Sequence, residues 1–254
     1  MKKSRRIVSL AVLIVMFAFS ATSASDQRFC FGENNATNGR WSGAFGGSYN
    51  TAAGDYSVAI GGAHNYSAYN STATLGGQSN EASGESAVAV GGYGNTAAGA
   101  GSVVVGGDTN QASGTWYPSV FGGNTNTAAG DYSTVSGGHD NIAAGDYSTV
   151  SGGIYNTASG KGSTVAGGAW NTATGDQATA AGGFSNIASY KDSSAFGGTY
   201  NTASGSASTS VGGNNNTASG EESSTFGGSD NRAKSDFSAT FGGEGNIAAG
   251  KSSV

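Results

Sequence analysis

The side chains best suited to proton transfer in this sequence are two histidines, His64 and His139. Histidine changes charge near neutral pH and is therefore the commonest general acid or base. His139 precedes Asp140 and lies among repeated serines, so the three components of a nucleophilic triad are present. Adjacent side chains of an extended segment point away from one another, however, whereas a triad needs convergent groups. We therefore expect no catalytic residues.

Glycines and acidic residues raise the separate question of metal and phosphate binding. A recurrent Gly-Gly-x-x-Asn pattern superficially resembles the shorter calcium-binding solenoid repeats, but those carry a carboxylate in every unit and this one carries neutral asparagine. Asp55, Asp131 and Asp146 recur in a Gly-Asp-Tyr-Ser segment, which is typical of a solvated turn. No helical pattern follows the glycines to offer phosphate a helix N-terminus. We expect no metal site and no cofactor.

The composition accounts for this shortage of reactive groups. Glycine makes up 46 of 254 residues, proline occurs once, and charged residues are only 11% of the chain. A single proline excludes a collagen-like triple helix. Aromatic residues at 10% together with sparse charge argue against disorder. A strict internal repeat is the remaining explanation.

Residues 1–24 are predicted to be an export signal. The basic segment Lys2–Arg6 precedes an apolar run, Ile7–Phe19, that is too short to span a bilayer. Small residues follow, and cleavage is expected after Ala24. We therefore expect an exported protein, extracellular or at the cell surface, with no membrane insertion by this chain.

The exported part is acidic and has one thiol. Without the four basic residues of the leader, 7 Lys and Arg stand against 16 Asp and Glu, a net charge of 7 − 16 = −9. We expect no nucleic-acid partner, because phosphate contacts need basic side chains. Cys30 has no internal partner and is either a small capping residue or an intermolecular bridge.

A repeat runs through the chain from residue 42 to residue 254, after a lead-in at 25–41. Fourteen glycine pairs recur every 15 residues, except for one spacing of 16 around Trp116-Tyr117-Pro118. An asparagine follows each pair at the third residue, and alanine comes two residues later in every unit except at Ser67. The asparagines are Asn50, Asn65, Asn80, Asn95, Asn110, Asn126, Asn141, Asn156, Asn171, Asn186, Asn201, Asn216, Asn231 and Asn246.

The period indicates a parallel β-solenoid of about 14 coils, all-β, with 15 residues per coil. Helical repeats are longer and need leucine-rich faces that are absent here. One strand is expected at segments such as Ser57–Ile60 and the other at segments such as Asn156–Ser159. Glycines at the turns would supply positive φ, and coils stacked about 4.8 Å apart would form a rod.

Stacking should place equivalent residues above one another. The asparagines are then expected to form a buried ladder of side-chain amide hydrogen bonds that sets the register of every coil. The alanines indicate little room inside the coil. The position before each glycine pair points to the opposite face from its inward neighbour. It forms an apolar stripe of Phe45, Ile60, Leu75, Val90, Val105, Phe121, Phe196, Val211, Phe226 and Phe241.

The stripe predicts self-association. Serine and alanine replace its apolar residues at Ser136, Ser151, Ala166 and Ala181, so its middle should be less apolar than its ends. A thin coil filled by alanine and serine buries little apolar area, and an exposed apolar ridge marks an interface. The alternative is that the stripe belongs to a wider monomeric core.

The run Ser57-Val58-Ala59-Ile60-Gly61, followed by the recurring Ala and Gly positions, resembles the YadA-like head repeats of trimeric autotransporter adhesins. The resemblance covers about Ser42 to Val254, with a unit one residue longer than is usual and with doubled glycine and asparagine. It implies a left-handed parallel β-roll, three of which pack around a threefold axis with the stripe facing that axis. It also implies attachment of bacteria to host matrix, to cells or to one another.

The chain departs from that family at its end. It has no heptad-patterned stalk and no amphipathic anchor strands, and it stops at Lys251-Ser252-Ser253-Val254. We expect a truncated copy of a longer adhesin, the alternative being an open end that stacks on another molecule.

The most variable positions are the two residues after each glycine pair. Variation within a strict repeat indicates exposed turns, and Tyr49, Tyr155, Trp170 and Tyr200 are the candidate ligand-contacting residues, although tolerated surface residues would look the same. An ice-binding surface is disfavoured because the threonines at Thr134 and its equivalents lack a second threonine column. The sequence therefore predicts a non-enzymatic, homotrimeric adhesin head that binds host matrix or cell-surface molecules. The alternative is a secreted structural rod without a specific ligand.

Overall fold

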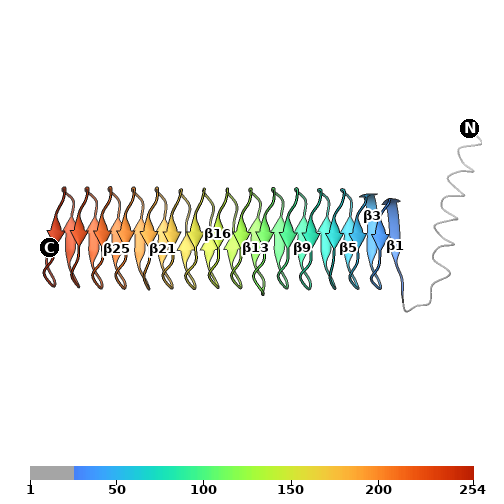
Figure 1. The fold of residues 1–254 in the computed structure, drawn as a ribbon, viewed down its shortest axis with the longest axis horizontal. Helices are drawn as coiled ribbons and strands as arrows, with labels where there is room; N and C mark the ends of the chain where they lie inside the picture. Colours follow the sequence, from blue (N-terminus) through green and yellow to red (C-terminus); the bar gives the residue numbers. More distant parts are fainter. Residues whose placement is uncertain (1–25) are drawn as a thin grey trace, which may run out of the picture.

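The computed structural model describes residues 26–254, and the expected export signal at 1–24 lies outside them. None of residues 26–254 is helical, and the chain winds into a straight β-solenoid in which successive coils stack side by side (Figure 1). The prediction of an all-β parallel solenoid is confirmed.

Each coil contributes one strand to each of two 15-stranded sheets. The first sheet contains β1 (Phe29–Glu33), β3 (Gly43–Ser48), β5 (Val58–Ile60), β7 (Ala73–Leu75), β9 (Val88–Val90), β11 (Val103–Val105), β13 (Ser119–Phe121), β15 (Thr134–Val135), β17 (Thr149–Val150), β19 (Thr164–Val165), β21 (Thr179–Ala181), β23 (Ser194–Phe196), β25 (Thr209–Val211), β27 (Ser224–Phe226) and β29 (Ala239–Phe241).

The second sheet is built from shorter strands. It contains β2 (Ala36–Thr37), β4 (Thr51–Ala52), β6 (Tyr66–Ser67), β8 (Glu81–Ala82), β10 (Thr96–Ala97), β12 (Gln111–Ala112), β14 (Thr127–Ala128), β16 (Ile142–Ala143), β18 (Thr157–Ala158), β20 (Thr172–Ala173), β22 (Ile187–Ala188), β24 (Thr202–Ala203), β26 (Thr217–Ala218), β28 (Arg232–Ala233) and β30 (Ile247–Ala248).

Neighbouring strands are parallel and pair equivalent residues of successive units. Val103 pairs with Val88 at the 15-residue offset, whereas Val103 pairs with Ser119 at an offset of 16. The extra residue is absorbed in the turn, where Ala100 forms an isolated bridge with Trp116. The strand register therefore continues through the one irregular unit.

The predicted lead-in at 25–41 includes a further coil. Strand β1 pairs with β3, and β2 pairs with β4, so the solenoid has 15 coils where the glycine pairs indicated about 14. At the position of the glycine pair this coil has a single glycine, Gly32, which is why the repeat pattern did not reveal it.

The interior is a single file of small side chains between the two sheets. Val104, Val120 and Val135 in the first sheet and Ala112 and Ala128 in the second are completely buried. Because strand residues alternate in direction, only one residue of each two- or three-residue strand points inward. The core is accordingly thin, as the alanine positions predicted.

The glycines serve two different purposes. Gly61 and Gly62 both have positive φ, +66° and +71°, but a Cβ on Gly61 would meet open space whereas one on Gly62 would overlap the carbonyl oxygen of Gly77. The later glycine, represented by Gly84, is outside the positive-φ region, which corrects the expectation for that turn. It is needed because a Cβ there would overlap the carbonyl of Gly99 in the next coil.

Residues other than glycine, several of them aromatic, also occupy left-handed positions at the corners of the coil. Tyr49 (φ 57°) and Tyr56 (φ 59°) mark the two corners of one coil, and their equivalents recur along the rod. Their backbone N–H groups donate to Glu33 and Arg40 of the preceding coil at 2.9 and 2.8 Å. These bonds hold a conformation that costs non-glycine residues roughly 1–2 kcal/mol.

We predict that Gly62→Ala destabilises the protein much more than Gly61→Ala. Both changes place a side chain at positive φ, costing roughly 1–2 kcal/mol, but only the first also forces a neighbouring coil away. Urea unfolding followed by circular dichroism measures both variants, and equal losses would contradict close coil contact at Gly62.

Candidate interaction surfaces

The asparagine ladder is buried and structural. Asn50 to Asn231 in the sequence list above are all at most 1% exposed, whereas Asn246 in the last coil is exposed. In the Asn156 unit, Nδ2 donates to the carbonyls of Gly152 and Gly168, each at 2.9 Å, and Oδ1 accepts the backbone N–H of Asn171 at 2.9 Å. One side chain thus bonds to the first glycine of its own pair, to the second glycine of the next pair and to the asparagine of the following coil.

The hydrogen bonding differs in kind from the expected amide-to-amide ladder. Direct amide-to-amide bonds occur at Asn80–Asn65, Asn126–Asn110 and Asn246–Asn231, at 3.2, 3.1 and 3.0 Å. The regular links run between side chain and backbone, because the glycine carbonyls and the next N–H need partners inside the coil. Asn35 is a further member that the repeat pattern missed, with its Oδ1 2.8 Å from the N–H of Asn50.

A second ladder follows the exposed corner with the Gly-Asp-Tyr-Ser segment. Asp131 Oδ1 accepts the backbone N–H of Trp116 at 3.0 Å, and Asp146 Oδ1 accepts that of Asp131 at 3.1 Å. These aspartates are therefore not only solvated, because each also accepts a hydrogen bond from the preceding coil. The sequence pattern that could have indicated this ladder is the recurrence of Asp at one position of the unit.

Asp55 extends this ladder into an ion pair. It accepts the backbone N–H of Arg40 at 2.8 Å and pairs with the guanidinium at 2.7 Å. These interactions, the backbone hydrogen bond first, hold the pKa of the Asp55 carboxyl below its usual range. The same carboxylate raises the pKa of Arg40.

The apolar stripe lies on the outward face of the first sheet. Phe45, Phe121, Phe196 and Phe226 are exposed, and Phe241 in the last coil reaches 66%. Val90 and Val211 are half-buried. Phe226 and Phe241 stack with centroids 5.2 Å apart. The stripe follows one column of the sheet, as the alternation predicted.

The stripe is divided where serine and alanine replace its large residues. Strands β15, β17 and β19 are only two residues long, since Ser136, Ser151 and Ala166 fall outside them. The glycines that follow, Gly137, Gly152 and Gly167, have φ values of 134°, 134° and 113°, whereas the first glycine of each other pair has a φ of about 65°. The apolar surface therefore has two separate parts along the rod.

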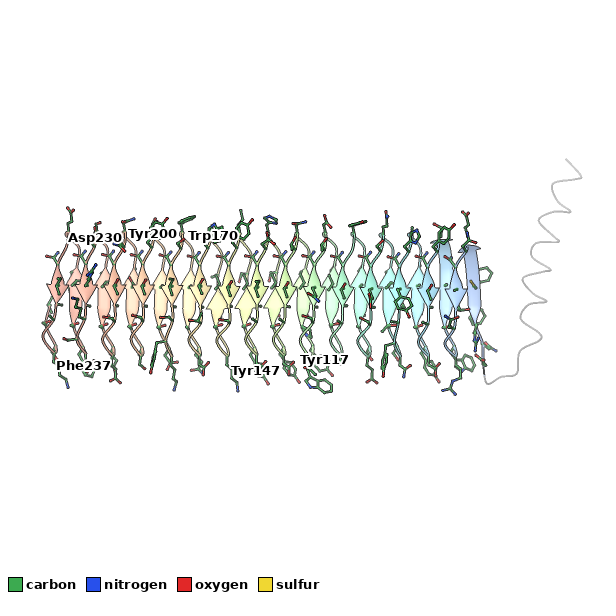
Figure 2. All side chains as sticks on the ribbon, viewed as in Figure 1. Tyr117, Tyr147, Trp170, Tyr200, Asp230 and Phe237 are labelled. Carbon is green, nitrogen blue, oxygen red and sulfur yellow. The ribbon has the colours of Figure 1, made fainter. Side chains whose placement is uncertain are left out.

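The four candidate ligand-facing aromatics share one corner of the coil. Tyr49, Tyr155, Trp170 and Tyr200 each precede a ladder asparagine, all at positive φ and all exposed. The structure brings Tyr155 and Trp170 together, with centroids 4.3 Å apart, and leaves Tyr49 stacked on His64 at 4.9 Å. Trp170 and Tyr200 project from one edge of the rod (Figure 2).

The opposite edge carries a second aromatic column that sequence reasoning passed over. Tyr117, Tyr132 and Tyr147 stack in succession, with centroids 5.5 and 5.1 Å apart. Tyr117, Tyr147 and Phe237 project from this edge in Figure 2. The available signal was an aromatic residue in the second position after the later glycine.

Two of the groups considered for catalysis do meet, contrary to the expectation that adjacent side chains point apart. His139 pairs with the adjacent Asp140 at 3.2 Å on an exposed corner and lies 5.6 Å from the ring of Tyr155. Ser148 and Ser163 are buried inside the coil. No group of three His, Cys, Asp or Glu residues that could hold a metal occurs within residues 26–254.

Cys30 lies in the first coil, in register with the inward residue Ala44. It is exposed because no coil covers that end among the described residues, and its thiol donates to the Asn35 carbonyl at 3.1 Å. The part of the chain described here has no helix long and apolar enough to cross a membrane.

Comparison of the sequence with known protein families and with curated proteins found no match.

We predict that Asn156→Ala costs about 3 kcal/mol of folding free energy. The change leaves the Gly152 carbonyl and the Asn171 N–H without these partners, each worth about 1–3 kcal/mol, whereas the Gly168 carbonyl still accepts the N–H of Ile154. Thr157→Ala, on the outward face of β18, is the matched control and should cost much less. Equal urea midpoints for the two variants would show that the ladder does not secure the coils.

Asp55 should make stability depend on acid pH. Its lowered pKa means that the charged form favours the folded state, so its contribution is present above the unfolded pKa of about 3.9 and is lost as pH falls through the lower folded value. The difference in melting temperature between wild type and Asp55→Asn should therefore shrink on acidification. Arg40→Gln should reduce the same pH dependence without abolishing it, because the backbone N–H of residue 40 still donates to Asp55. A pH-independent difference between wild type and Asp55→Asn would contradict the ion pair.

Proposed function

We propose that this protein is the head of a bacterial surface adhesin, exported, non-catalytic and active as a homotrimer. The observation that carries the proposal is the outward apolar stripe on an otherwise thin solenoid. Its exposed phenylalanines lie in one column, beside an interior filled by alanine and valine. A single copy leaves this column uncovered, and contact with further copies would remove it from water.

A parallel trimer suits the geometry of the rod. The stripe residues of successive coils are spaced about 4.8 Å apart along the rod axis. Copies aligned in parallel can therefore contact one another at equivalent positions along their whole length. A threefold arrangement closes on itself and leaves no unpaired stripe, whereas an unclosed arrangement would grow without limit. The two aromatic corners and the second sheet would then remain on the outside.

The sequence supports the surface location and the role. The predicted export signal, the net negative charge and the resemblance of Ser57–Gly61 and its equivalents to YadA-like head repeats all favour attachment to host matrix, to cells or to other bacteria. The exposed corner aromatics are the kind of side chain that anchors a partner. A host-attachment role in virulence is part of this proposal.

The proposal predicts that breaking the stripe removes both the trimer and attachment. Phe196→Asp with Phe226→Asp introduces repelling charges at the interface, so light scattering should report monomers where the wild type gives three times that mass. Beads coated with wild type should bind epithelial cells or immobilised matrix proteins, and the variant should bind at least tenfold less because multivalency is lost.

The control adds the same charges to the other sheet. Thr202→Asp with Thr217→Asp should retain the trimer and the binding. A folded wild-type monomer at micromolar concentration would refute the oligomer, and a trimer that attaches to no surface would favour a structural rod instead.

A further inference from the structure

At residue 162 the second aromatic column has no side chain, and the space at that position is called the open rung. Tyr132 and Tyr147 stack with their ring planes 1° from parallel, and the next residue of the column is Gly162. A Cβ built on Gly162 would meet only Gln177 Cγ, at 3.8 Å. The face of the Tyr147 ring turned away from Tyr132 therefore has no side chain of residue 162 against it.

A hollow of about 410 Å³ occupies this rung, lined by Tyr147, Lys161, Gly162, Asp176, Gln177 and Lys191. Its volume falls within the range of small-ligand sites. The glycine at the equivalent position of an earlier coil, Gly101, leaves no such space, because a Cβ there would overlap the ring of Tyr117. The open rung is thus a local feature of residues 147–191.

The thickness of the hollow suits one six-membered ring. Coils follow one another at about 4.8 Å, and the preceding rung holds a tyrosine ring 5.1 Å from its neighbour. A ring bound in the Gly162 rung would lie at a similar distance from Tyr147, which is the separation of stacked rings. Tyr147 is 57% exposed, so the rung is reached directly from solvent.

The polar lining alternates in charge. Lys161, Asp176 and Lys191 occupy one column in successive coils, and Asp176 Oδ1 accepts the backbone N–H of Lys161 at 3.2 Å. Lys191 also lies 4.0 Å from Asp192. Cations and anions in alternation do not select an ion of one sign. They favour a neutral ligand whose groups both donate and accept hydrogen bonds.

We propose that this hollow binds a neutral pyranose unit of a glycan. The apolar face of the sugar ring stacks on Tyr147, and its hydroxyl groups bond to Lys161, Asp176, Gln177 and Lys191. The site lies within one chain and does not need a second copy. It rests on the proposed attachment function, which it deepens by naming the class of ligand.

Saturation-transfer NMR on the purified mature chain tests the site with the methyl pyranosides of glucose, galactose, mannose and N-acetylglucosamine. At least one should receive saturation, with its ring protons affected most. Gly162→Tyr fills the rung with a side chain that Tyr132 and Tyr147 already carry at the same φ, and it should abolish the signal. Tyr147→Ser, a residue found in the same column at Ser71 and Ser86, should weaken binding at least tenfold.

Ala207→Tyr is the matched control, because it adds the same side chain to the same column away from the hollow, and it should bind as wild type. Circular dichroism shows whether each variant is folded. The proposal is overturned if none of the four sugars binds or if Gly162→Tyr still binds one of them.

The two proposals fail separately. If the wild type binds sugar and Gly162→Tyr does not, but the wild type attaches to no cells, the attachment function is refuted and the sugar site is retained. If the wild type attaches to cells but binds none of the sugars, the sugar site is refuted and the attachment function is retained.

Discussion

Each coil of this rod is tied to the next by one buried side chain, the ladder asparagine. The interior is too narrow for large apolar residues, so Ala112 and Val120 give little specificity of register. The amide supplies it, because the Asn156 side chain bonds to two glycine carbonyls and to the N–H of Asn171. A coil displaced by one residue would break these bonds and leave the buried Asn156 amide and the Asn171 N–H without partners, a large penalty in a low-dielectric interior.

Stacking under this constraint turns the surface into columns. A residue at one position of the unit always lies beside its equivalents, so an apolar choice yields a stripe, an acidic choice yields the Asp131–Asp146 ladder, and an aromatic choice yields a stack. A missing side chain can then leave a space between neighbours. Gly162 does so beside Tyr147 without altering the fold, because the backbone already adopts positive φ there.

Much of the fold was readable from the sequence. The segments Ser57–Ile60 and Asn156–Ser159 were expected as strands, and strands occur at Val58–Ile60 and Thr157–Ala158. The first coil escaped notice because Gly32 is not doubled and the asparagine there, Asn35, stood outside the counted repeat. The outward direction of the stripe could be predicted, since alternation along a strand is a local property, but Phe31 of the first coil, which is in register with Phe45, was missed. The second aromatic corner was missed, although the Gly-Asp-Tyr-Ser segment contained it.

The sequence by itself determined the period, the parallel stacking and which residues face inward, because glycine spacing and strand alternation depend only on near neighbours along the chain. Only the tertiary structure decided which residues of different coils meet at the corners. Tyr147 and Lys191 are far apart in sequence and line one hollow because successive coils place them on the same edge. It also decided that the asparagines bond to backbone groups, since only the completed stack brings the Gly168 carbonyl against Asn156.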